Sequence, residues 1–561
     1  MSIPQACPWR DLYPAAVPAQ MAVEHDSLAA AWRARVARAP DAVALRYFDG
    51  ALTAQEVDAA SDALAVAFAA RGTRRGDRVG IYLQNIPQYA LVLLALWKLG
   101  AVALLLNPMY RRDELRRLVD DAATVGIVCA DTDVGEMRAS LAGSPVRWTV
   151  STSALDFQNR DDPRVFLSAE RPTPAPDGDL SALLREFTGC RPDPVELTRD
   201  DVALLTYTSG TTGPPKGAMN THGNVLNVAL TNAAWADLAD GDVVYALAPL
   251  FHITGAVVNA AISLITPTTL VFTGRFHPEV ALDALAEHRV TFMVGSITAY
   301  NAMYAVEHAG PEHFATAKHL FSGGSPVPPS TVDRFQNRFG VYIHNIYGMT
   351  ETSSAVIAVP PGTSAPVHEA SGTLSIGVPL PNLTARVIDP DGHALPPGEQ
   401  GELELSGPQV APGYWRHPAA TQQTMPGGRL RTGDGAIIDE RGWVYLVDRL
   451  KDQINVSGYK VWPREVEDAL YEHPAVHEAA VVGQPDDYRG ETVVAYVSLT
   501  AGATATPDEL ISFTRDRLAA YKRPTEVHLR ADLPKTQSGK IRRAELRRTS
   551  DRDLPPTTTK G

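Results

Sequence analysis

The sequence of 561 residues contains only three cysteines, Cys7, Cys129 and Cys190, which lie far apart along the chain. No two of them form a CxxC pair, so neither a disulfide framework nor a structural zinc site is expected. An uninterrupted apolar run of membrane-spanning length is also missing, because Lys98 and Gly100 interrupt the most apolar stretch, 90–106. We interpret this stretch as a buried helix that leads into a buried strand.

The N-terminus has no basic segment followed by an apolar core, so it does not resemble a secretory signal, and the expected location is the cytoplasm. The 51 basic and 64 acidic residues give a net charge of −13, which argues against a non-specific nucleic-acid binder. Apolar residues make up 45% of the chain, which excludes disorder of the whole chain. At roughly 100–200 residues per domain, this length predicts about two to four domains.

Lysine is scarce, since only 9 of the 51 basic residues are lysine and the others are arginine. Five of the nine lie in Gly-rich segments that resemble loops: Lys216, Lys451, Lys460, Lys535 and Lys540. Lysine places a compact charge on a flexible stem, which suits contact with a phosphate or a reacting carboxylate. Chance and solvation are the alternative explanation.

The first 150 residues alternate between helical and strand-like patterns, which predicts an α/β fold with parallel sheets. The expected helices are 54–71, 88–99 and 111–122, and the expected strands are 77–83, 101–106 and 125–130. Residues 156–194 are rich in Pro, Asp and Arg and are expected to form a loop-rich connection. The α/β pattern resumes over 202–345.

The pattern changes twice in the last third of the chain. Short β-rich runs over 372–447 predict a small β-barrel or sheet subdomain. Beyond residue 449 we expect helices at 466–471 and 507–520 and strands at 479–482 and 493–499. The predicted fold is α/β, with a large N-terminal domain (1–450) of two α/β subdomains plus the β-barrel-like subdomain. A small mobile α+β C-terminal domain (451–550) and a disordered tail (551–561) follow.

The strongest chemical signal is the segment VALLTYTSGTTGPPKG at 202–217, where a strand is followed by a loop of hydroxyls and glycines and then by Lys216. Glycines let backbone N–H groups approach an anion, while hydroxyls and a lysine add donors and charge. The pattern therefore favours a triphosphate cradle. It differs from the Walker motif, because GK[ST] is missing and no helix is expected directly after the lysine. A flexible Ser/Thr/Gly turn is the alternative.

This loop resembles the signature loop of the adenylate-forming superfamily, which includes acyl-CoA synthetases, adenylation domains of nonribosomal peptide synthetases and beetle luciferase. Other segments resemble the family's motifs in the same order: YGMTE at 347–351, RTGD at 431–434, DRLKD with SGYK within 448–460, and PKTQSGK at 534–540. The motifs span 207–540, and a weaker likeness covers 30–150.

The resemblance implies an ATP site built from several motifs. The residues expected to contact ATP are Thr208, Ser209, Gly210, Thr211, Thr212, Gly213 and Lys216 in the loop, Gly323, Gly324, Ser325, Tyr347 and Gly348 at the adenine, Thr350 at the α-phosphate, and Asp434 and Arg449 at the ribose. Glu351 and Thr208 are expected to bind Mg²⁺, which prefers hard oxygen ligands. Solvated side chains, core packing or loop salt bridges are the alternatives for these residues.

Lys540 resembles the lysine that bridges the substrate carboxylate and the α-phosphate. A fixed ammonium there would offset the repulsion between two anions that must meet. Lys451 resembles the family's hinge, about which the C-terminal domain is expected to turn between two half-reactions. The resemblance implies that a segment of the C-terminal domain then replaces the Lys540 loop at the active site. This segment contains Ser457, Gly458 and Lys460, and the glycine would let the pantetheine arm of coenzyme A approach closely. A basic surface run and an exposed linker lysine are the alternatives for Lys540 and Lys451.

His252, in the segment PLFHITG, resembles the residue that gates the carboxylate end of the acyl pocket, and a buried core histidine is the alternative. The pocket is expected near 253–257, 294–300, 323–326 and 352–357, where side chains are small or apolar. No Asp is found there to hold an amino group. The prediction is a hydrophobic acid, such as a medium- or long-chain fatty acid, and an aryl acid such as a cinnamate stays open.

The function predicted is that of an ATP-dependent, AMP-forming acyl-CoA ligase, which makes acyl-AMP and pyrophosphate and then transfers the acyl group to coenzyme A. One alternative is an acyl-AMP ligase that serves a carrier protein or an amine, and another is a non-catalytic nucleotide- or acyl-binding protein. Ala54, Ala411 and the run at 425–428 depart from the family's usual residues without removing an expected catalytic group. The sequence leaves open whether the protein forms a homodimer.

Overall fold

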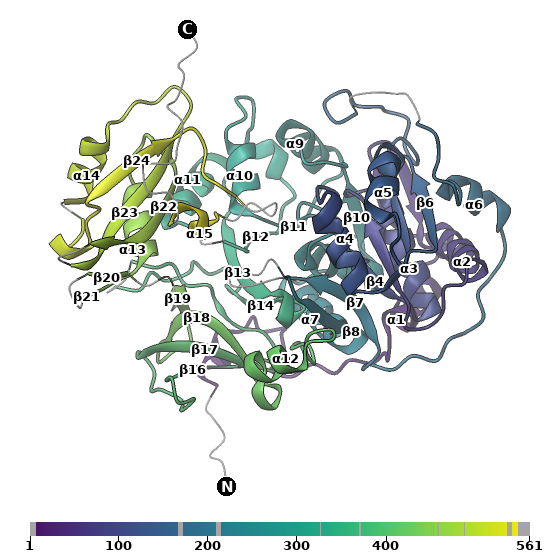
Figure 1. Ribbon diagram of the computed structural model, residues 1–561, viewed down its shortest axis with the longest axis horizontal. Coiled ribbons are helices and arrows are strands. Elements are labelled where there is room, and N and C mark those ends of the chain that lie inside the picture. The colour runs from purple at the N-terminus through teal and green to yellow at the C-terminus, as the bar shows by residue number, and fades with distance from the viewer. Residues whose placement is uncertain are drawn as a thin grey trace.

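The computed structural model describes residues 7–166, 172–208, 215–325, 327–369, 372–449, 452, 454–456, 459–486, 489–515, 517–535 and 541–547. Two large sheets, a smaller antiparallel sheet and a C-terminal unit (the described residues from 454 to 547) make up the molecule. In Figure 1 the six-stranded sheet lies towards the right and the C-terminal unit lies at the left. The tail 551–561, which was predicted to be disordered, lies outside the described residues.

The six-stranded sheet is the first α/β layer. Its order is β6 (Trp148–Thr152), β5 (Thr124–Ala130), β3 (Arg78–Tyr82), β4 (Val102–Leu105), β7 (Val202–Tyr207) and β8 (Gly217–Thr221). All neighbouring pairs are parallel except β7 and β8. Helices of this layer are α2 (Ala54–Ala70), α3 (Pro87–Leu99), α4 (Arg112–Asp121), α5 (Val134–Leu141) and α6 (Leu180–Glu186). Helix α6 lies within the segment 156–194, which was expected to form a loop-rich connection.

A nine-stranded sheet forms the second layer. Its order is β15 (Val378–Pro379), β14 (Ser354–Ala358), β13 (Ile343–Met349), β12 (His319–Ser322), β11 (Phe292–Gly295), β9 (Val243–Tyr245), β10 (Thr269–Phe272), β1 (Val43–Tyr47) and β2 (Gly50–Thr53). Its helices include α1 (Leu28–Arg38), α7 (His222–Trp235), α8 (Ile262–Ile265), α9 (Pro278–Glu287), α10 (Ile297–Tyr304) and α11 (Pro329–Phe339). The first two strands therefore join a sheet whose other strands come from the middle of the chain.

Helix α3 joins the two large sheets. Every residue of the helix is buried, and it contacts β1 of one sheet and β3 and β4 of the other. It begins with Pro87 at a first-turn position and ends at Gly100, whose φ of 65° is a left-handed conformation favoured by glycine. The interpretation of the apolar stretch as a helix followed by a strand is confirmed. In the part of the chain that the structure describes, no helix has the length and apolar character needed to cross a membrane.

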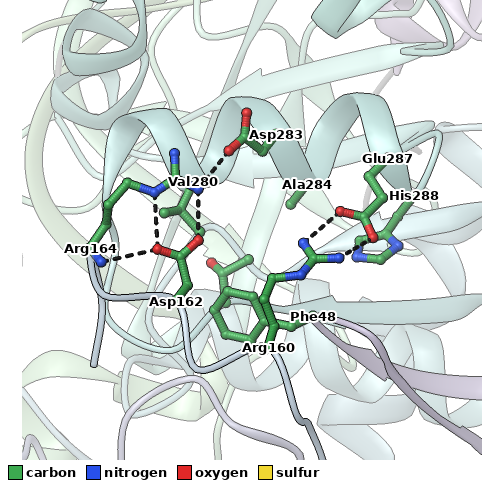
Figure 2. Close-up of a pocket in the computed structure, with 10 residues that line it drawn as sticks. Phe48, Arg160, Asp162, Arg164, Val280, Asp283, Ala284, Glu287 and His288 are labelled. Atoms are coloured by element: carbon green, nitrogen blue, oxygen red, sulfur yellow. Dashed lines mark hydrogen bonds and ion pairs between the residues drawn. The ribbon is translucent and has the colours of Figure 1, made fainter. Parts of the chain in front are cut away.

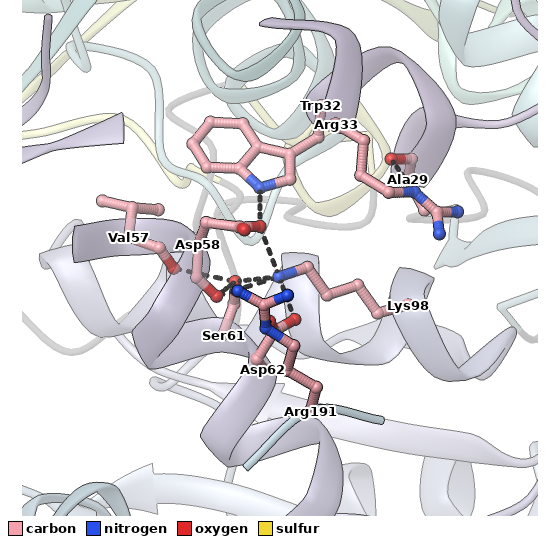
Figure 3. A network of polar contacts seen from close by, with 9 residues as sticks. All are labelled: Ala29, Trp32, Arg33, Val57, Asp58, Ser61, Asp62, Lys98 and Arg191. Atoms are coloured by element: carbon pink, nitrogen blue, oxygen red, sulfur yellow. Dashed lines mark hydrogen bonds and ion pairs between the residues drawn. The ribbon is translucent and has the colours of Figure 1, made fainter. Parts of the chain in front are cut away.

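Lys98 carries a buried charge on α3, and only 5% of its side chain is exposed (Figure 3). Its ammonium donates to Asp58 Oδ1 at 2.7 Å, Asp62 Oδ1 at 2.6 Å, Ser61 Oγ at 2.8 Å and the Asp58 carbonyl at 2.9 Å. Trp32 of α1 donates its indole N–H to the same Asp58 oxygen at 2.8 Å. This network ties three helices together, because a buried charge needs a full set of partners.

The predicted small β subdomain is a four-stranded antiparallel sheet, β16 (Thr384–Ile388), β17 (Gln400–Ser406), β18 (Leu430–Ile438) and β19 (Val444–Arg449). Helix α12 (Pro418–Thr424) lies between β17 and β18 in the chain.

The C-terminal unit has cores of its own around β22 (Val476–Asp486) and β23 (Gly490–Leu499). Its other elements are β20 (Ile454–Val456), β21 (Tyr459–Val461), β24 (Glu526–Arg530), α13 (Pro463–Tyr471), α14 (Pro507–Arg515) and α15 (Arg543–Leu546). Helix α13 begins three residues before the predicted start, because Pro463 fits the first turn of a helix. Helix α14 ends at Arg515, and a separate 3₁₀ turn, Ala520–Lys522, leads towards β24, so the predicted helix end at 520 was wrong.

Candidate active site

The glycine- and hydroxyl-rich loop connects two antiparallel strands at the edge of the six-stranded sheet. Tyr207 at the end of β7 pairs with Gly217 at the start of β8, and the Thr208 N–H donates to the Lys216 carbonyl at 3.0 Å. A strand thus follows Lys216, in agreement with the expectation that no helix begins there. Both ends of the predicted phosphate loop are fixed by the sheet. Ser209, Gly210, Thr211, Thr212 and Gly213 lie outside the described residues.

A polar cluster around Asp121 holds the end of β7. The Tyr207 hydroxyl donates to Asp121 Oδ2, and the Trp415 indole N–H donates to the Asp121 carbonyl at 3.2 Å. Burial, assisted by the negative charge of Asp121, raises the pKa of Tyr207 far above its ordinary value. The phenol therefore stays protonated and remains a donor that anchors the strand next to Thr208.

The segment YGMTE begins with the last three residues of β13 and continues into a 3₁₀ helix, Thr350–Thr352, which leads to β14. A Cβ on Gly348 would lie 1.9 Å from the Ser354 carbonyl oxygen, so only glycine fits this close approach of the two strands. Asn220 of β8 donates its amide to the Thr350 carbonyl at 2.9 Å and to Ser353 Oγ at 3.0 Å. The two motifs predicted to bind phosphate and metal are therefore connected by a side chain of β8.

Glu351 is buried at 6% exposure, and Tyr414 donates its hydroxyl to Glu351 Oε1 at 2.6 Å. The Lys216 ammonium lies 5.3 Å from the centre of the Tyr414 ring. Thr208, Lys216 and Glu351 thus belong to one neighbourhood assembled from β7, β8 and the 3₁₀ turn. A carboxylate and a hydroxyl are oxygen ligands of the kind that Mg²⁺ prefers, so the donor set fits this ion.

The predicted adenine and ribose residues are also brought together. The Tyr347 hydroxyl donates to Asp434 Oδ2 at 2.7 Å, and Asp434 pairs with Arg449 across β18 and β19. Gly323, Gly324 and Ser325 follow β12, which pairs with β13. A Cβ on Gly323 would lie 2.3 Å from the Ile346 carbonyl oxygen, directly before Tyr347. The side chain of Arg449 is not described.

The loop that carries Lys540 leaves the C-terminal unit from a narrow base. Lys535 and Ile541 form an antiparallel bridge, and the Arg542 N–H donates to the Pro534 carbonyl at 2.7 Å. Lys540 itself lies outside the described residues, as do Lys451, Ser457 and Gly458. Lys460 is described only as part of β21.

His252 precedes a π-helix, Gly255–Ala261, in which every residue is buried. The Thr254 N–H donates to His252 Nδ1 at 3.3 Å, so this ring nitrogen accepts a hydrogen bond. A Cβ on Gly255 would lie 2.2 Å from the Pro249 carbonyl oxygen, which explains the glycine. Single π turns are frequent at functional sites, because they displace side chains relative to an α-helix.

Comparison with known proteins agrees with this arrangement. A family model described as AMP-binding enzyme matches residues 32–415, which is more than half of the chain, and a model of the AMP-binding enzyme C-terminal domain matches 465–540. The chain belongs to the AMP-binding enzyme family. The predicted superfamily and fold class and the predicted enzyme class, an AMP-forming acyl-CoA synthetase, are confirmed by the matches to this family and its relatives.

Two curated relatives and two solved structures illustrate the similarity. A long-chain-fatty-acid–CoA ligase of Bacillus subtilis is 33% identical over 96% of this chain and 97% of its own length. A feruloyl-CoA synthase of an Amycolatopsis species is 34% identical over 92% of this chain and 98% of its own. ATP-bound MatB from Rhodopseudomonas palustris has a TM-score of 0.82 at 28% identity, with 93% of this chain and 98% of that chain covered. An o-succinylbenzoate coenzyme A synthetase of Bacillus subtilis, in complex with ATP and a magnesium ion, has a TM-score of 0.77 at 28% identity, with 92% of this chain and 98% of that chain covered.

A pocket of this AMP-binding enzyme lies between the segment 160–164 and α9 and is lined by several charged side chains (Figure 2). Its charged side chains pair with one another: Arg160 with Glu287 at 2.6 Å, and Arg164 with Asp162 and Asp283 at 2.7 Å. None of the predicted active-site residues that the structure describes lines it. We interpret it as the contact that fastens the segment 160–164 onto α9, since its charges are already satisfied.

Three residues that position the site of this AMP-binding enzyme were missed by the sequence analysis. Tyr414 and Asn220 hold the Glu351 turn, as described above. Asn85 donates its amide to the Ala246 and Ala248 carbonyls at 2.7 and 3.0 Å and accepts the Leu250 N–H at 2.8 Å. It thereby fixes the segment that leads to His252. A signal existed only for Tyr414, which lies in the GYW run, whereas isolated asparagines carry no readable pattern.

Proposed function

We propose that this AMP-binding enzyme activates a hydrophobic carboxylic acid with ATP as acyl-AMP, releases pyrophosphate, and transfers the acyl group to coenzyme A. The observation that carries the proposal is the convergence of Lys216 and Glu351 on Tyr414, next to Thr208. It supports a site for a metal-bound triphosphate, because one ammonium, one carboxylate and the loop hydroxyls meet there. The family match supports the same chemistry.

Thr208 and Glu351 are the residues that would hold Mg²⁺, and the ion would offset the charge of the phosphates. Asp434 would accept the ribose hydroxyls, and Tyr347 would lie against the adenine. Thr350 would donate to the α-phosphate from the turn that Asn220 fixes. Glu351 and Asp434 each accept a tyrosine hydroxyl, so little reorganisation of these two carboxylates would be needed during the reaction.

The C-terminal unit would act as the mobile lid, with the boundary at 450–451 and the hinge at Lys451. Its separate cores support this division, because few contacts then have to break when it turns. One orientation would bring Lys540 to the carboxylate and the α-phosphate. The other would bring Ser457, Gly458 and Lys460 to the site for the thiol of coenzyme A.

The acid would be an aliphatic one of medium or long chain. The segments predicted to line the pocket include the apolar side chains Ala256, Val257, Val294 and Ile357, which suit an apolar chain. Each buried CH₂ contributes about 0.8 kcal/mol, so the preference for chain length would be graded. An aryl acid is the second candidate, since a feruloyl-CoA synthase is among the relatives. The cytoplasmic location and the homodimer stay predictions.

Pyrophosphate release with ATP and Mg²⁺ tests the proposal, with decanoate and ferulate compared in the presence and absence of coenzyme A. Thioester formation that depends on coenzyme A is the expected result. Accumulation of acyl-AMP without thioester would favour transfer to a carrier protein or an amine, and no pyrophosphate with any acid would refute the proposal.

The variant Lys540→Ala should lose adenylation by on the order of 10²–10³-fold and still convert supplied acyl-AMP to thioester. Lys318→Ala is the matched control, because that lysine is half-exposed and pairs with Asp242 at 2.8 Å outside the site. Equal loss of both half-reactions in Lys540→Ala would refute the alternation of the C-terminal unit.

A further inference from the structure

Tyr414 contacts two groups that the proposed function assigns to the nucleotide. Its hydroxyl donates to Glu351 Oε1 at 2.6 Å, and its ring faces the Lys216 ammonium at 5.3 Å. Tyr414 and Glu351 are each only 6% exposed. One side chain therefore links a carboxylate from the YGMTE turn to an ammonium from the phosphate loop, although 63 positions separate Tyr414 from Glu351.

The position of Tyr414 is set by its backbone. The segment pairs with β8 through an isolated antiparallel bridge between Tyr414 and Ala218. The Met219 N–H donates to the Gly413 carbonyl at 3.0 Å, and the Trp415 N–H donates to the Gly217 carbonyl at 2.7 Å. The Tyr414 N–H also donates to Thr421 Oγ1 at 2.9 Å. Because β8 begins directly after Lys216, the same strand positions both the end of the loop and the tyrosine.

The hydrogen bond between Tyr414 and Glu351 engages one carboxylate oxygen. The phenol O–H is the donor and Glu351 Oε1 is the acceptor. Within the described residues no bond to Glu351 Oε2 is recorded, so the second oxygen is available for a cation.

We propose that Tyr414 is a positioning residue, which orients Glu351 so that its second oxygen binds the divalent cation and holds Lys216 towards the phosphates. This inference rests on the proposed function. Partners of metal-ligating carboxylates fix the ligand's direction, and their loss typically weakens metal binding by about 10–100-fold. The ring contact acts on Lys216 separately, because a cation near an aromatic face is attracted by it without any hydrogen bond.

The two contacts can be separated by substitution. Tyr414→Phe removes the hydroxyl and keeps the ring, whereas Tyr414→Leu removes both. With the non-hydrolysable analogue α,β-methylene-ATP, Mn²⁺ binding measured by electron paramagnetic resonance should be about 10-fold weaker in Tyr414→Phe. Binding of the same analogue in EDTA should be unchanged in Tyr414→Phe and weakened in Tyr414→Leu, where Lys216 loses its ring.

Tyr13→Phe is the matched control. This substitution also removes a partly buried hydrogen bond of a tyrosine hydroxyl, to the Pro379 carbonyl at 2.6 Å, but at a position outside the site. It should leave both measurements unchanged. The inference is overturned if Tyr414→Phe binds Mn²⁺ as tightly as the unaltered enzyme. It is also overturned if Tyr414→Phe loses analogue binding in EDTA by the same factor, since that would indicate general loosening of the site. Failure of the proposed function would differ, since the unaltered enzyme itself would then bind neither the analogue nor Mn²⁺.

Discussion

Tyr347 and Asp434 are joined by a hydrogen bond of 2.7 Å from the phenol to the carboxylate, although 87 positions separate them in the chain. The first residue belongs to the YGMTE segment at the end of the nine-stranded sheet, and the second to the RTGD segment of the four-stranded sheet. Adenine and ribose are adjacent in a nucleotide, so residues predicted to bind them must also be adjacent. The hydrogen bond shows that the YGMTE and RTGD motifs lie next to each other.

Asp434→Ala should weaken ATP binding by about 10–100-fold, because hydrogen bonds to a charged group contribute roughly 1.5–3 kcal/mol. The measurement compares the KM for ATP with that for 2′,3′-dideoxy-ATP. The unaltered enzyme should discriminate strongly against the dideoxy analogue, and Asp434→Ala should accept both equally poorly. Tyr347→Phe keeps the carboxylate and should keep the discrimination. Persistent discrimination in Asp434→Ala would show that another residue binds the ribose.

Lys98→Met should lower the free energy of unfolding by about 3 kcal/mol, because it leaves Asp58 and Asp62 without the cation that both contact. Urea unfolding followed by circular dichroism measures the change. Arg38→Met is the control: its ion pair with Asp240 is more than half exposed on both sides, so the loss should be within about 0.5 kcal/mol. A similar loss of unfolding free energy in both variants would mean that the buried position of Lys98 does not strengthen its contribution to stability.

The sequence allowed a good prediction of the elements whose signals are local. Helix α3 and strand β4 follow from one apolar stretch with Gly100 between them, and the strands around 78–130 follow from their apolar runs. The π-helix Gly255–Ala261 could not be found in this way, because the close approach of Gly255 to Pro249 sets it rather than any 3.6-residue period. Helix α6 is short. Its N-cap residue, Asp179, lies in a polar segment that resembles a loop, so the start of the helix could not be recognised from the sequence.

The residues of the candidate site could be proposed from the sequence, whereas the contacts that support them could not. Glycines, hydroxyls and charged residues in matching motifs led to the predictions for Thr208, Lys216, Glu351 and Asp434, and their roles stay predictions. The contacts that orient them join distant segments, such as Asn220 with Thr350 and Tyr414 with Glu351. Such pairs depend on how the sheets pack, and no local pattern encodes that packing. The pairing of the first strands with the middle of the chain escaped prediction for the same reason.

The stability of the protein should fall on acidification from pH 6.5 towards pH 4, in part through His222. Burial lowers the pKa of His222 from 6.5 to about 4, against a smaller opposite effect of Asp201, and its Nδ1 accepts the Leu28 N–H at 3.3 Å. Between these two pKa values the unfolded chain binds a proton at His222 that the folded chain does not. The contribution of the neutral His222 to the free energy of unfolding is therefore fully present above pH 6.5 and is lost as the pH falls towards 4. The loss is on the order of 3 kcal/mol.

His222→Asn provides the check, because an amide oxygen can accept the Leu28 N–H without titrating. Midpoints of thermal unfolding between pH 7.5 and 4.5 should fall less steeply in this variant than in the unaltered protein. Parallel curves would mean that His222 is not responsible.

Arg464 forms a contact between the C-terminal unit and the rest of the chain. Its Nη2 donates to the Val327 carbonyl at 3.2 Å and its Nε to Asp468 at 3.2 Å, with 7% of the side chain exposed. Val327 lies two residues after Ser325, beside the segment expected to line the adenine. Under the proposed rotation about Lys451, this bond can exist in only one of the two orientations. Arg464→Ala should therefore shift the balance away from the orientation seen here.

Under the proposed function, we take the orientation described here to be the one for adenylation. Arg464→Ala should thus slow acid-dependent pyrophosphate exchange several-fold, by the roughly 1–1.5 kcal/mol of one hydrogen bond, and leave the reaction of supplied acyl-AMP with coenzyme A unchanged or faster. Arg517→Ala is the control, because its ion pair with Glu472 at 2.7 Å stays within the C-terminal unit in either orientation. Slowing of the second half-reaction by the same factor would place Arg464 among residues that merely hold the unit together.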